Sequence, residues 1–574
     1  MNTSSAANYE FGDFRLEVSR RRLLRRGEAV ALTPKLFDTL LHLVQNHDRV
    51  CEKEELMQAL WPDTAVEENN LNQTISALRR SLTQGAGEDR YIITVPGRGY
   101  RFSAAVRSTP KDAATIKAIA VLPFKPLVLE DRDEALELGM ADTLIARLSQ
   151  TRGTVVRPLT SVRKFTSLDQ DAAAAGRELG VHSVLDGSIQ RRGNLIRVTA
   201  RLTNVADESS LWSQTFDEEF TDVFAVQDAI SEKVAAALAM RLSTEEKKGL
   251  TKRYTENVEA YHLYLKGLYH LGKVTPPAIR KGIEFFQQAV EMDPVYALAY
   301  AGIAEAYRRL PITSDVPPKE AFPRAKSAAL KALEIDDTLA EAHMSLGWVR
   351  FWYEWDWQEG EKELLRAIEL SPSNGVAQMS HLVLLATQGR MDEAIQAGYR
   401  SVEFEPLSQI VNANLAWCLH CGHRDQEAVA RLEKTLEIDP NFWVAHLNLG
   451  KIYTRQREYA RAIAAFEKAK QFSGGNSETI SMIGHASALA GNRTKAVESL
   501  NELKLLSSQR YIPPHNIAVI YAALGDKQQT CAWLEKAYED RDVRLTLIKV
   551  ESKWDLFRAE PCFQSILKRV GLTS

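Results

Sequence analysis

The chain has 574 residues, of which 45% are hydrophobic and 26% charged, an ordinary balance for a water-soluble protein of roughly three or four domains. The formal net charge of −3 excludes a protein that is basic throughout, so any surface for nucleic acid must be local. The five cysteines make no disulfide framework, which favours a reducing compartment.

Charged residues interrupt the first thirty residues, so no apolar signal core is expected there. The run that most resembles a membrane segment, IKAIAVLPF (116–124), is too short to span a bilayer. We therefore expect a cytoplasmic protein without a membrane anchor.

The N-terminal zone mixes strand and helix signals. Two strand-like stretches, EFGDFRLEV and RRRLLRRGEAVAL, precede predicted helices over residues 34–47, 51–61 and 66–82. The stretch YIITVPGRGYRF (91–102) predicts a β-hairpin, because strand formers flank the turn formers Pro-Gly-Arg-Gly. Its turn is basic, which favours an anionic partner.

The third predicted helix has an apolar stripe and a polar face. The stripe recurs at helical spacing: Leu71, Ile75, Leu78 and Leu82. The opposite face holds Asn69, Gln73, Ser76, Ala77 and Arg80, flanked by Asn72, Thr74 and Arg79. Amides can pair with adenine and arginine with guanine or phosphate, so this face is typical of major-groove reading. The alternative is an ordinary solvated face, but residues 69–107 carry six basic and two acidic side chains, a local excess of +4 (6 − 2).

Residues 8–104 resemble the OmpR/PhoB-type winged-helix DNA-binding domain, and we delimit the domain as 8–106. The resemblance rests on LTPKLFDTLLHLVQNHDRV, EELMQALW, NNLNQTISALRRSL and YIITVPGRGYRF. It implies that helix 67–82 is the recognition helix, lying in the major groove of double-stranded DNA. It implies also that hairpin 91–102 is the wing.

The resemblance assigns roles to single residues. The residues expected to face bases or nearby sugars are Gln73, Thr74, Ser76 and Ala77. Asn69, Asn72 and Arg80 of the same helix are also expected to contact DNA. Arg79 is expected to reach a phosphate or a base, and Arg98 to approach the minor groove. Residues expected to position the DNA backbone are Lys53, Trp61, Thr94 and Tyr100.

This chain also departs from the family pattern. Many relatives carry arginine where Ser76 and Ala77 stand, and some where Pro96 stands, so fewer direct phosphate contacts are expected. No receiver domain precedes the winged helix, an arrangement that looks like the CadC-like one-component regulators without their usual membrane segment. Relatives often bind direct repeats in pairs, so the resemblance implies a dimer on DNA.

A linker is predicted over residues 107–116 and a module of βα character over 117–245. Residues 119–124 and 196–205 predict strands, and residues 139–150 predict an amphipathic helix. The zone resembles the TolB N-terminal-like domain, which implies a non-catalytic α/β module. We interpret Asp186-Gly187 as a turn at a strand end.

Residues 258–574 are predicted to form an all-α solenoid. Small or apolar residues recur every 34 positions in two sets: Leu382, Ala416, Gly450, Gly484 and Ala518, then Ala394, Ala428, Ala462, Ala496 and Thr530. This period resembles tetratricopeptide repeats over about 258–540, with an extra residue near WYEWDW (352–357). Stacked repeats expose a groove for a protein or peptide partner.

Two clusters allow alternative interpretations. Cys418, Cys421 and His423 have metal-like spacing, but no second Cys/His pair lies close in sequence, so we favour helix packing. The tryptophan-rich stretch 348–357 predicts core packing, with an aromatic partner site as the alternative. We find no P-loop, HExxH or GxSxG motif and expect no enzyme, no cofactor and no metal.

The predicted fold class is multidomain α+β: a winged helix, a small α/β module and a tetratricopeptide solenoid. The leading hypothesis is a sequence-specific transcriptional regulator whose repeats sense or bind a protein. The alternative is a tetratricopeptide scaffold or adaptor whose winged helix serves protein contacts. A scaffold does not need a basic, amide-rich face at Gln73–Arg80.

Overall fold

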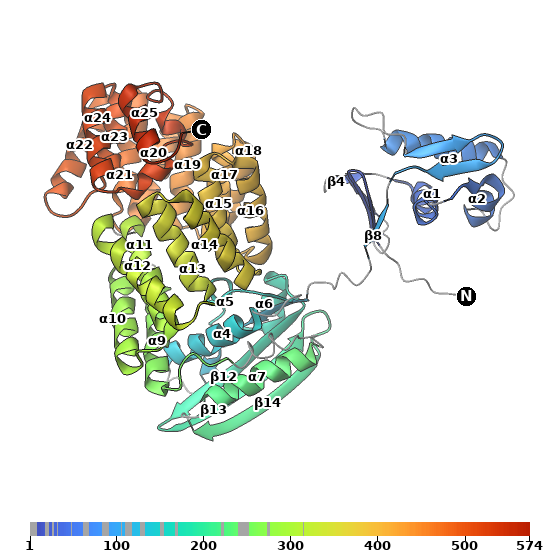
Figure 1. Ribbon diagram of the computed structural model, residues 1–574, viewed down its shortest axis with the longest axis horizontal. Coiled ribbons are helices and arrows are strands. Elements are labelled where there is room, and N and C mark those ends of the chain that lie inside the picture. The colour runs from blue at the N-terminus through green and yellow to red at the C-terminus, as the bar shows by residue number, and fades with distance from the viewer. Residues whose placement is uncertain are drawn as a thin grey trace. The chain divides into compact units, whose positions relative to one another are not determined.

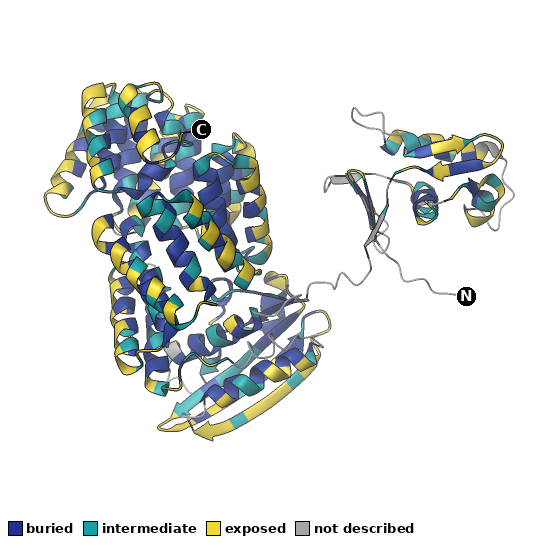
Figure 2. Ribbon diagram, in the orientation of Figure 1, coloured by how far each residue is buried: buried dark blue, intermediate teal, exposed yellow. Residues whose placement is uncertain are grey.

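The computed structural model describes residues 8–17, 22–25, 28–30, 32–47, 49–60, 68–82, 91–104, 106–109, 117–126, 133–149, 154–166, 170–219, 223–238, 252–272, 276–313 and 315–573. The chain divides into two compact units, Met1–Ile116 and Lys117–Ser574. Figure 1 labels their elements, and Figure 2 shows that each unit has its own buried interior.

The first unit opens with an antiparallel sheet in the order β4-β3-β2-β1-β8. Its strands are β1 (Asn8–Phe11), β2 (Phe14–Glu17), β3 (Arg22–Arg25), β4 (Glu28–Val30) and β8 (Arg107–Thr109). Strand β8 pairs with β1, with Asn8 opposite Thr109. Residues 107–109 thus belong to this sheet, and the predicted linker is wrong there, because the returning chain pairs with the edge that β1 would otherwise leave open.

The predicted helices and hairpin of the first unit are confirmed. Their elements are α1 (Pro34–Gln45), β5 (Cys51–Glu52), α2 (Lys53–Leu60), α3 (Glu68–Leu82), β6 (Ile92–Val95) and β7 (Gly99–Phe102). The second helix begins two residues later than predicted, because Cys51 and Glu52 pair with Tyr100 and Gly99 of β7. Such cross-strand pairing leaves no signal in a short stretch of sequence.

One core joins these elements. The apolar stripe of α3 is buried as predicted, with Leu71, Ile75, Leu78 and Leu82 at most 2% exposed. It packs in the same cluster as Phe37 of α1 and the aromatic rings of the sheets, which are Phe11, Phe14, Tyr100 and Phe102. Three helices, an N-terminal sheet and a C-terminal hairpin on one core make a winged-helix fold.

The second unit begins with a six-stranded mixed sheet in the order β11-β9-β12-β13-β14, with β10 also paired to β12. The strands are β9 (Lys117–Val121), β10 (Lys125–Pro126), β11 (Thr154–Val156), β12 (Ser183–Arg192), β13 (Leu195–Asn204) and β14 (Ser210–Glu219). The helices are α4 (Glu134–Ser149), α5 (Leu159–Val162), α6 (Ala172–Glu178) and α7 (Val223–Ala237). The predicted strands and helix of this zone are confirmed.

Asp186 and Gly187 lie inside β12, so the predicted turn at a strand end is wrong. Asp186 accepts hydrogen bonds from Arg201 on β13 at 2.9 and 3.2 Å. A Cβ at Gly187 would stand 2.1 Å from the Thr199 carbonyl oxygen and 2.8 Å from the Phe124 ring. The glycine therefore permits close packing in mid-strand, a role that local turn propensity cannot reveal.

Helix pairs make up the rest of the second unit. They are α9 (Val258–Leu271), α10 (Pro276–Met292), α11 (Ala297–Thr313), α12 (Pro318–Ile335), α13 (Ala340–Trp348), α14 (Trp357–Leu370), α15 (Gly375–Gln388), α16 (Met391–Phe404), α17 (Gln409–Cys421), α18 (Asp425–Ile438), α19 (Trp443–Arg455), α20 (Tyr459–Phe472), α21 (Ser477–Leu489), α22 (Arg493–Ser507), α23 (Pro514–Leu524) and α24 (Lys527–Glu539). The residues of both 34-residue sets are buried. A Cβ at Gly450 would meet Phe466 at 2.4 Å, so the period marks where helices approach closely.

The extra residue near the tryptophans is absorbed by a π-helix, η2 (Val349–Glu354), which continues α13. A π-turn accommodates one inserted residue without ending the helix. Trp355 then takes a positive φ of 61° before α14 begins. The repeat therefore survives the insertion.

The α/β module shares its core with the first solenoid helix. Tyr261 and Leu265 of α9 belong to the cluster that fills the module. The guanidinium of buried Arg157 donates to the carbonyl oxygens of Glu403 and Phe404, at the end of α16, at 2.9 and 2.7 Å. The module and the solenoid, expected as separate domains, thus form one compact unit.

The chain ends in short turns and one helix, which are η3 (Val543–Leu547), η4 (Ser552–Trp554) and α25 (Pro561–Arg569). Cys562 of α25 forms a disulfide with Cys531 of α24, a pairing that the sequence did not predict. A separation of 31 residues gave no hint of this pairing. Over the described residues, every helix is too short or too polar to traverse a lipid bilayer.

Candidate nucleic-acid interface

Helix α3 presents the predicted polar face to solvent. Asn72, Gln73, Ser76 and Arg80 are exposed, whereas Thr74 and Ala77 are half-buried. Asn69 lies in α3, but its side chain and the whole of Trp61 fall outside what the structure describes. The exposed row stands opposite the buried stripe of Leu71, Ile75, Leu78 and Leu82, so one face of the helix lies in the core and the other is open to solvent.

Arg79 ties α3 to the hairpin. Its Nε donates to the Ile92 carbonyl oxygen at 3.1 Å, and a terminal nitrogen donates to Thr94 Oγ1 at 2.8 Å. The guanidinium carbon also lies 6.0 Å from the centre of the Tyr100 ring. Arg79 and Thr94, both predicted to meet DNA, therefore bind each other within the domain.

Tyr100 connects the hairpin to the polar face of α3. Its ring is 4% exposed, and its hydroxyl donates to Asn72 Oδ1 at 2.5 Å. This bond sets the orientation of the Asn72 amide. Strands β6 and β7 thus support the exposed row of α3 from inside the domain.

The tip of the hairpin is the loop Pro96-Gly97-Arg98, closed by a hydrogen bond from the Arg98 amide to the Val95 carbonyl at 3.1 Å. All three residues are exposed. The Arg98 carbonyl accepts from the amide of Lys53, which begins α2 and is half-buried. This contact connects the tip to the second helix.

The two glycines of the hairpin serve different purposes. Gly97 has a φ of +73°, which the tight turn requires, and its Cβ position is open. A Cβ at Gly99 would stand 2.0 Å from the Cys51 carbonyl oxygen. Gly99 is therefore needed for the approach of β5.

Two further residues of this region were not among the predicted site residues. Arg101 is exposed on β7 between buried Tyr100 and Phe102, so strand alternation could have found it. On α2, Glu55 accepts hydrogen bonds from Arg49, which lowers the pKa of its carboxyl to about 2. This pair joins the segment before β5 to α2.

Family comparison adds an independent observation. Residues 27–102 match the family model described as "Transcriptional regulatory protein, C terminal", and residues 426–477 match "Tetratricopeptide repeat". The N-terminal region is an OmpR/PhoB-type domain. The OmpR/PhoB-type domain and the repeats occur here in one chain.

Relatives extend the likeness beyond the OmpR/PhoB-type domain. Transcriptional regulator HilA of Salmonella typhi is 25% identical over 419 residues, which cover 72% of this chain and 73% of HilA. Transcriptional activator CadC of Escherichia coli is 32% identical over 96 residues, 17% of this chain and 19% of CadC. Putative adenylate cyclase 3 of Rhizobium meliloti is 28% identical over 187 residues, 33% of this chain and 32% of that protein.

The Cys/His cluster packs within the solenoid. Cys418 is buried against Met391, with 3.6 Å between the sulfurs, and burial raises the pKa of its thiol to about 12. His420 shares a hydrogen bond with Asp425 at 2.7 Å. Within the described ranges, no three His, Cys, Asp or Glu side chains come together to hold a metal ion.

The tryptophan cluster is core. Trp348 donates to Ser380 Oγ at 2.8 Å, and Trp357 donates to the Val570 carbonyl at 2.9 Å. Trp355 lies between Tyr538 and the Arg541 guanidinium, which is 4.1 Å from its ring centre. The packing interpretation is thus confirmed for these three rings.

Proposed function

We propose that this protein is a sequence-specific DNA-binding transcriptional regulator. The supporting observation is the exposed row Gln73, Ser76 and Arg80 on α3, backed by a buried stripe and placed beside a hairpin with Arg98 at its tip. A helix of this width fits the major groove of B-DNA, and amide and guanidinium groups can read base edges there.

In this proposal the side chains fall into two groups: those that contact DNA, and those that hold the exposed row of α3 in position. In the proposal, side chains of the α3 row contact bases and phosphates, and Arg98 and Arg101 contact the backbone or minor groove. Arg79, Thr94 and Tyr100 position the row through the contacts they make inside the domain. This revises the expectation that these three meet DNA directly.

The second unit supplies the protein-interaction part of the regulator. We propose that its repeats bind or sense another protein and bias DNA occupancy, which requires two states of different DNA affinity. A chromosomal target places the protein in the cytoplasm, and paired binding to direct repeats would make it a dimer on DNA. The proposal requires no catalytic step.

The test is selection of bound sequences from random double-stranded DNA by the purified full chain. Wild type is compared with Gln73→Ala/Arg98→Ala and with a control, Lys362→Ala, which removes an exposed charge from α14. We expect wild type and control to enrich one motif. The double variant is expected to lose roughly 1–3 kcal/mol of binding per lost base contact and to relax the motif.

Failure of wild type to enrich any motif would leave the scaffold alternative standing. An unchanged motif and affinity in the double variant would reject α3 and the hairpin as the reading surface. Binding is also expected to weaken steeply as salt rises, because phosphate contacts release counterions.

A further inference from the structure

The inner helices of the solenoid are covered by the C-terminal segment, residues 543–573 of the same chain. Residues 377–387 of α15 and 479–487 of α21 are buried without a break, on every side of each helix. A solenoid with an open groove leaves one side of such helices in solvent. The segment contacts both helices, because Lys549 reaches the Gln388 carbonyl of α15 and Arg544 reaches Glu478 of α21. It thus occupies part of the surface where a groove for a partner was expected.

Apolar side chains of the segment complete the solenoid core. The large cluster that includes Leu382, Trp417 and Ile483 also contains Ile548, Trp554 and other segment residues, which are Leu545, Phe557, Phe563, Ile566, Leu567, Val570 and Leu572. Trp554 is fully buried and lies 5.4 Å, centre to centre, from the ring of His515 on α23. The segment binds mainly by burying apolar area.

Charged and polar contacts determine how the segment lies. Lys451 of α19 meets Glu551 at 3.1 Å and Glu478 of α21 at 3.0 Å. Lys549 donates to the Gln388 carbonyl at the end of α15 at 2.9 Å. Buried ion pairs contribute little net stability but penalise every misaligned arrangement, which makes them suited to recognition.

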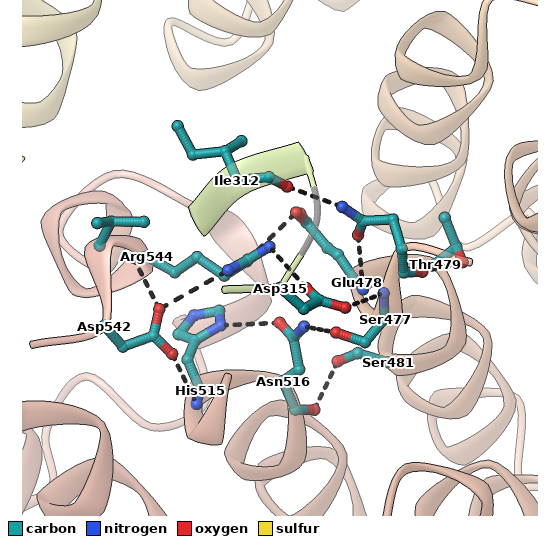
Figure 3. A network of polar contacts seen from close by, with 12 residues as sticks. Ile312, Asp315, Ser477, Glu478, Thr479, Ser481, His515, Asn516, Asp542 and Arg544 are labelled. Atoms are coloured by element: carbon teal, nitrogen blue, oxygen red, sulfur yellow. Dashed lines mark hydrogen bonds and ion pairs between the residues drawn. The ribbon is translucent and has the colours of Figure 1, made fainter. Parts of the chain in front are cut away.

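Figure 3 shows the start of the segment. Arg544 reaches Glu478 at 3.5 Å, and Asp542 accepts from the His515 amide at 3.1 Å. Asp315, between α11 and α12, lies 3.9 Å from Arg544 and accepts from the Ser477 amide at 3.1 Å. The segment thus touches early and late repeats together.

The segment is not another repeat. Its first half consists of the short turns η3 and η4 instead of a helix pair. Its far end is joined to the last helix pair by the Cys531–Cys562 disulfide, which closes a loop of 31 residues and so restricts departure of the segment. Reduction breaks the S–S bond: a dithiol supplies two electrons and two protons and itself becomes a disulfide.

We propose that residues 543–573 act as an intramolecular ligand of the solenoid, that the Cys531–Cys562 disulfide retains them, and that reduction lets a protein partner take their place. The partner is a peptide segment with the same chemistry, an aromatic and aliphatic stretch carrying a carboxylate that meets Lys451. A tethered segment competes at high effective concentration, so the partner binds well only when the tether is weakened.

The first test is hydrogen exchange of the full chain with and without dithiothreitol. Reduction is expected to speed exchange over 543–560 and 377–387 by about tenfold or more. The Cys531→Ser/Cys562→Ser variant should exchange fast in both conditions, which separates the disulfide from other effects of the reductant. Equal exchange in oxidised and reduced wild type overturns the retention by disulfide.

The second test uses a fluorescent peptide of residues 543–560 as the probe. Trp554→Ala in the reduced full chain weakens its own segment, and this variant is expected to bind the probe at least about tenfold more tightly than oxidised wild type. A probe with Glu551→Lys should lose that binding. Glu551→Gln in the full chain is the milder second variant, in case Trp554→Ala does not fold. Absence of probe binding to the variant that folds overturns the proposal, and the result is independent of DNA binding.

Discussion

Helices α3 and α21 carry similar side chains and meet opposite surroundings. Helix α3 shows Gln73, Ser76 and Arg80 to solvent, whereas α21 buries its serines, Thr479 and His485. The difference lies outside both helices, because α20, α22, α23 and the C-terminal segment pack against α21, whereas no described element covers the exposed row of α3. Polar composition therefore does not tell whether a helix face is available to a partner.

Two buried serines of α21 make hydrogen bonds with α23. Ser481 donates to the Asn516 carbonyl at 2.6 Å, and Asn516 donates to Ser477 Oγ at 2.9 Å. A buried polar group without a partner is costly, so these bonds favour the packing of α21 against α23. On α3, by contrast, Gln73 and Ser76 are exposed to solvent.

Weakening the contact of the C-terminal segment with the solenoid is expected to have the largest effect on stability. Trp554→Ala should lower the free energy of unfolding of the second unit by about 3–5 kcal/mol, because a fully buried ring leaves a cavity. Leu556→Ala is the matched control: this neighbour is 82% exposed, and a change within about 0.5 kcal/mol is expected. Denaturant unfolding monitored by tryptophan fluorescence measures both. Equal losses would mean that Trp554 does not anchor the segment.

Low pH should also lower the free energy of unfolding of the second unit. Burial, with Lys553 nearby, lowers the pKa of His485 to about 4 in the folded protein, and Glu551 nearby acts in the opposite direction. Below pH 6.5 His485 binds a proton in the unfolded chain but stays neutral in the folded protein, which favours unfolding. The free energy of unfolding is therefore unaffected by His485 above pH 6.5 and falls as the pH drops toward 4. Between pH 7.5 and 5 the loss is about 2 kcal/mol. Urea unfolding at both pH values checks it, and His485→Gln should reduce the difference.

Two adjacent arginines on α3 should behave differently. Arg79→Ala removes two hydrogen bonds to β6 and should cost the first unit about 1–2 kcal/mol of stability. Arg80→Ala, on the exposed row, is expected to act on DNA binding. It should reduce the slope of log K against log salt for DNA binding by about 1. A reversed pattern would contradict the division into positioning and contacting residues.

The smallest expected effect compares two serines. Ser481→Ala deletes a buried hydrogen bond and should destabilise the second unit by about 1 kcal/mol. Ser76→Ala, on the exposed row of α3, should change stability by less than about 0.5 kcal/mol. Thermal unfolding of both variants measures the contrast. If Ser76→Ala were the more damaging change, the α3 row would have a structural role.

Local patterns predicted most of the elements. The spacing of Leu71, Ile75, Leu78 and Leu82 located the buried stripe of α3, and turn formers located the hairpin. The 34-residue period located the close helix contacts, of which Gly450 against Phe466 is one. These patterns repeat over a few residues or at a constant interval, which makes them visible in one sequence.

The incorrect predictions share a different cause. β5 exists because Cys51 meets Tyr100, and β8 exists because Thr109 meets Asn8. The disulfide and the cover of the solenoid likewise join segments that are distant in sequence. Such contacts depend on the path of the whole chain.

The sequence alone determined a winged helix with an exposed polar face on α3 and a solenoid of tetratricopeptide repeats, because both depend on periodic burial along single helices. Only the tertiary structure decided that Arg79, Thr94 and Tyr100 join α3 to the hairpin from inside the domain. It alone decided also that the α/β module joins the solenoid and that residues 543–573 fill its inner face. Each of these depends on which distant surfaces bury one another, and that is a property of the folded chain as a whole.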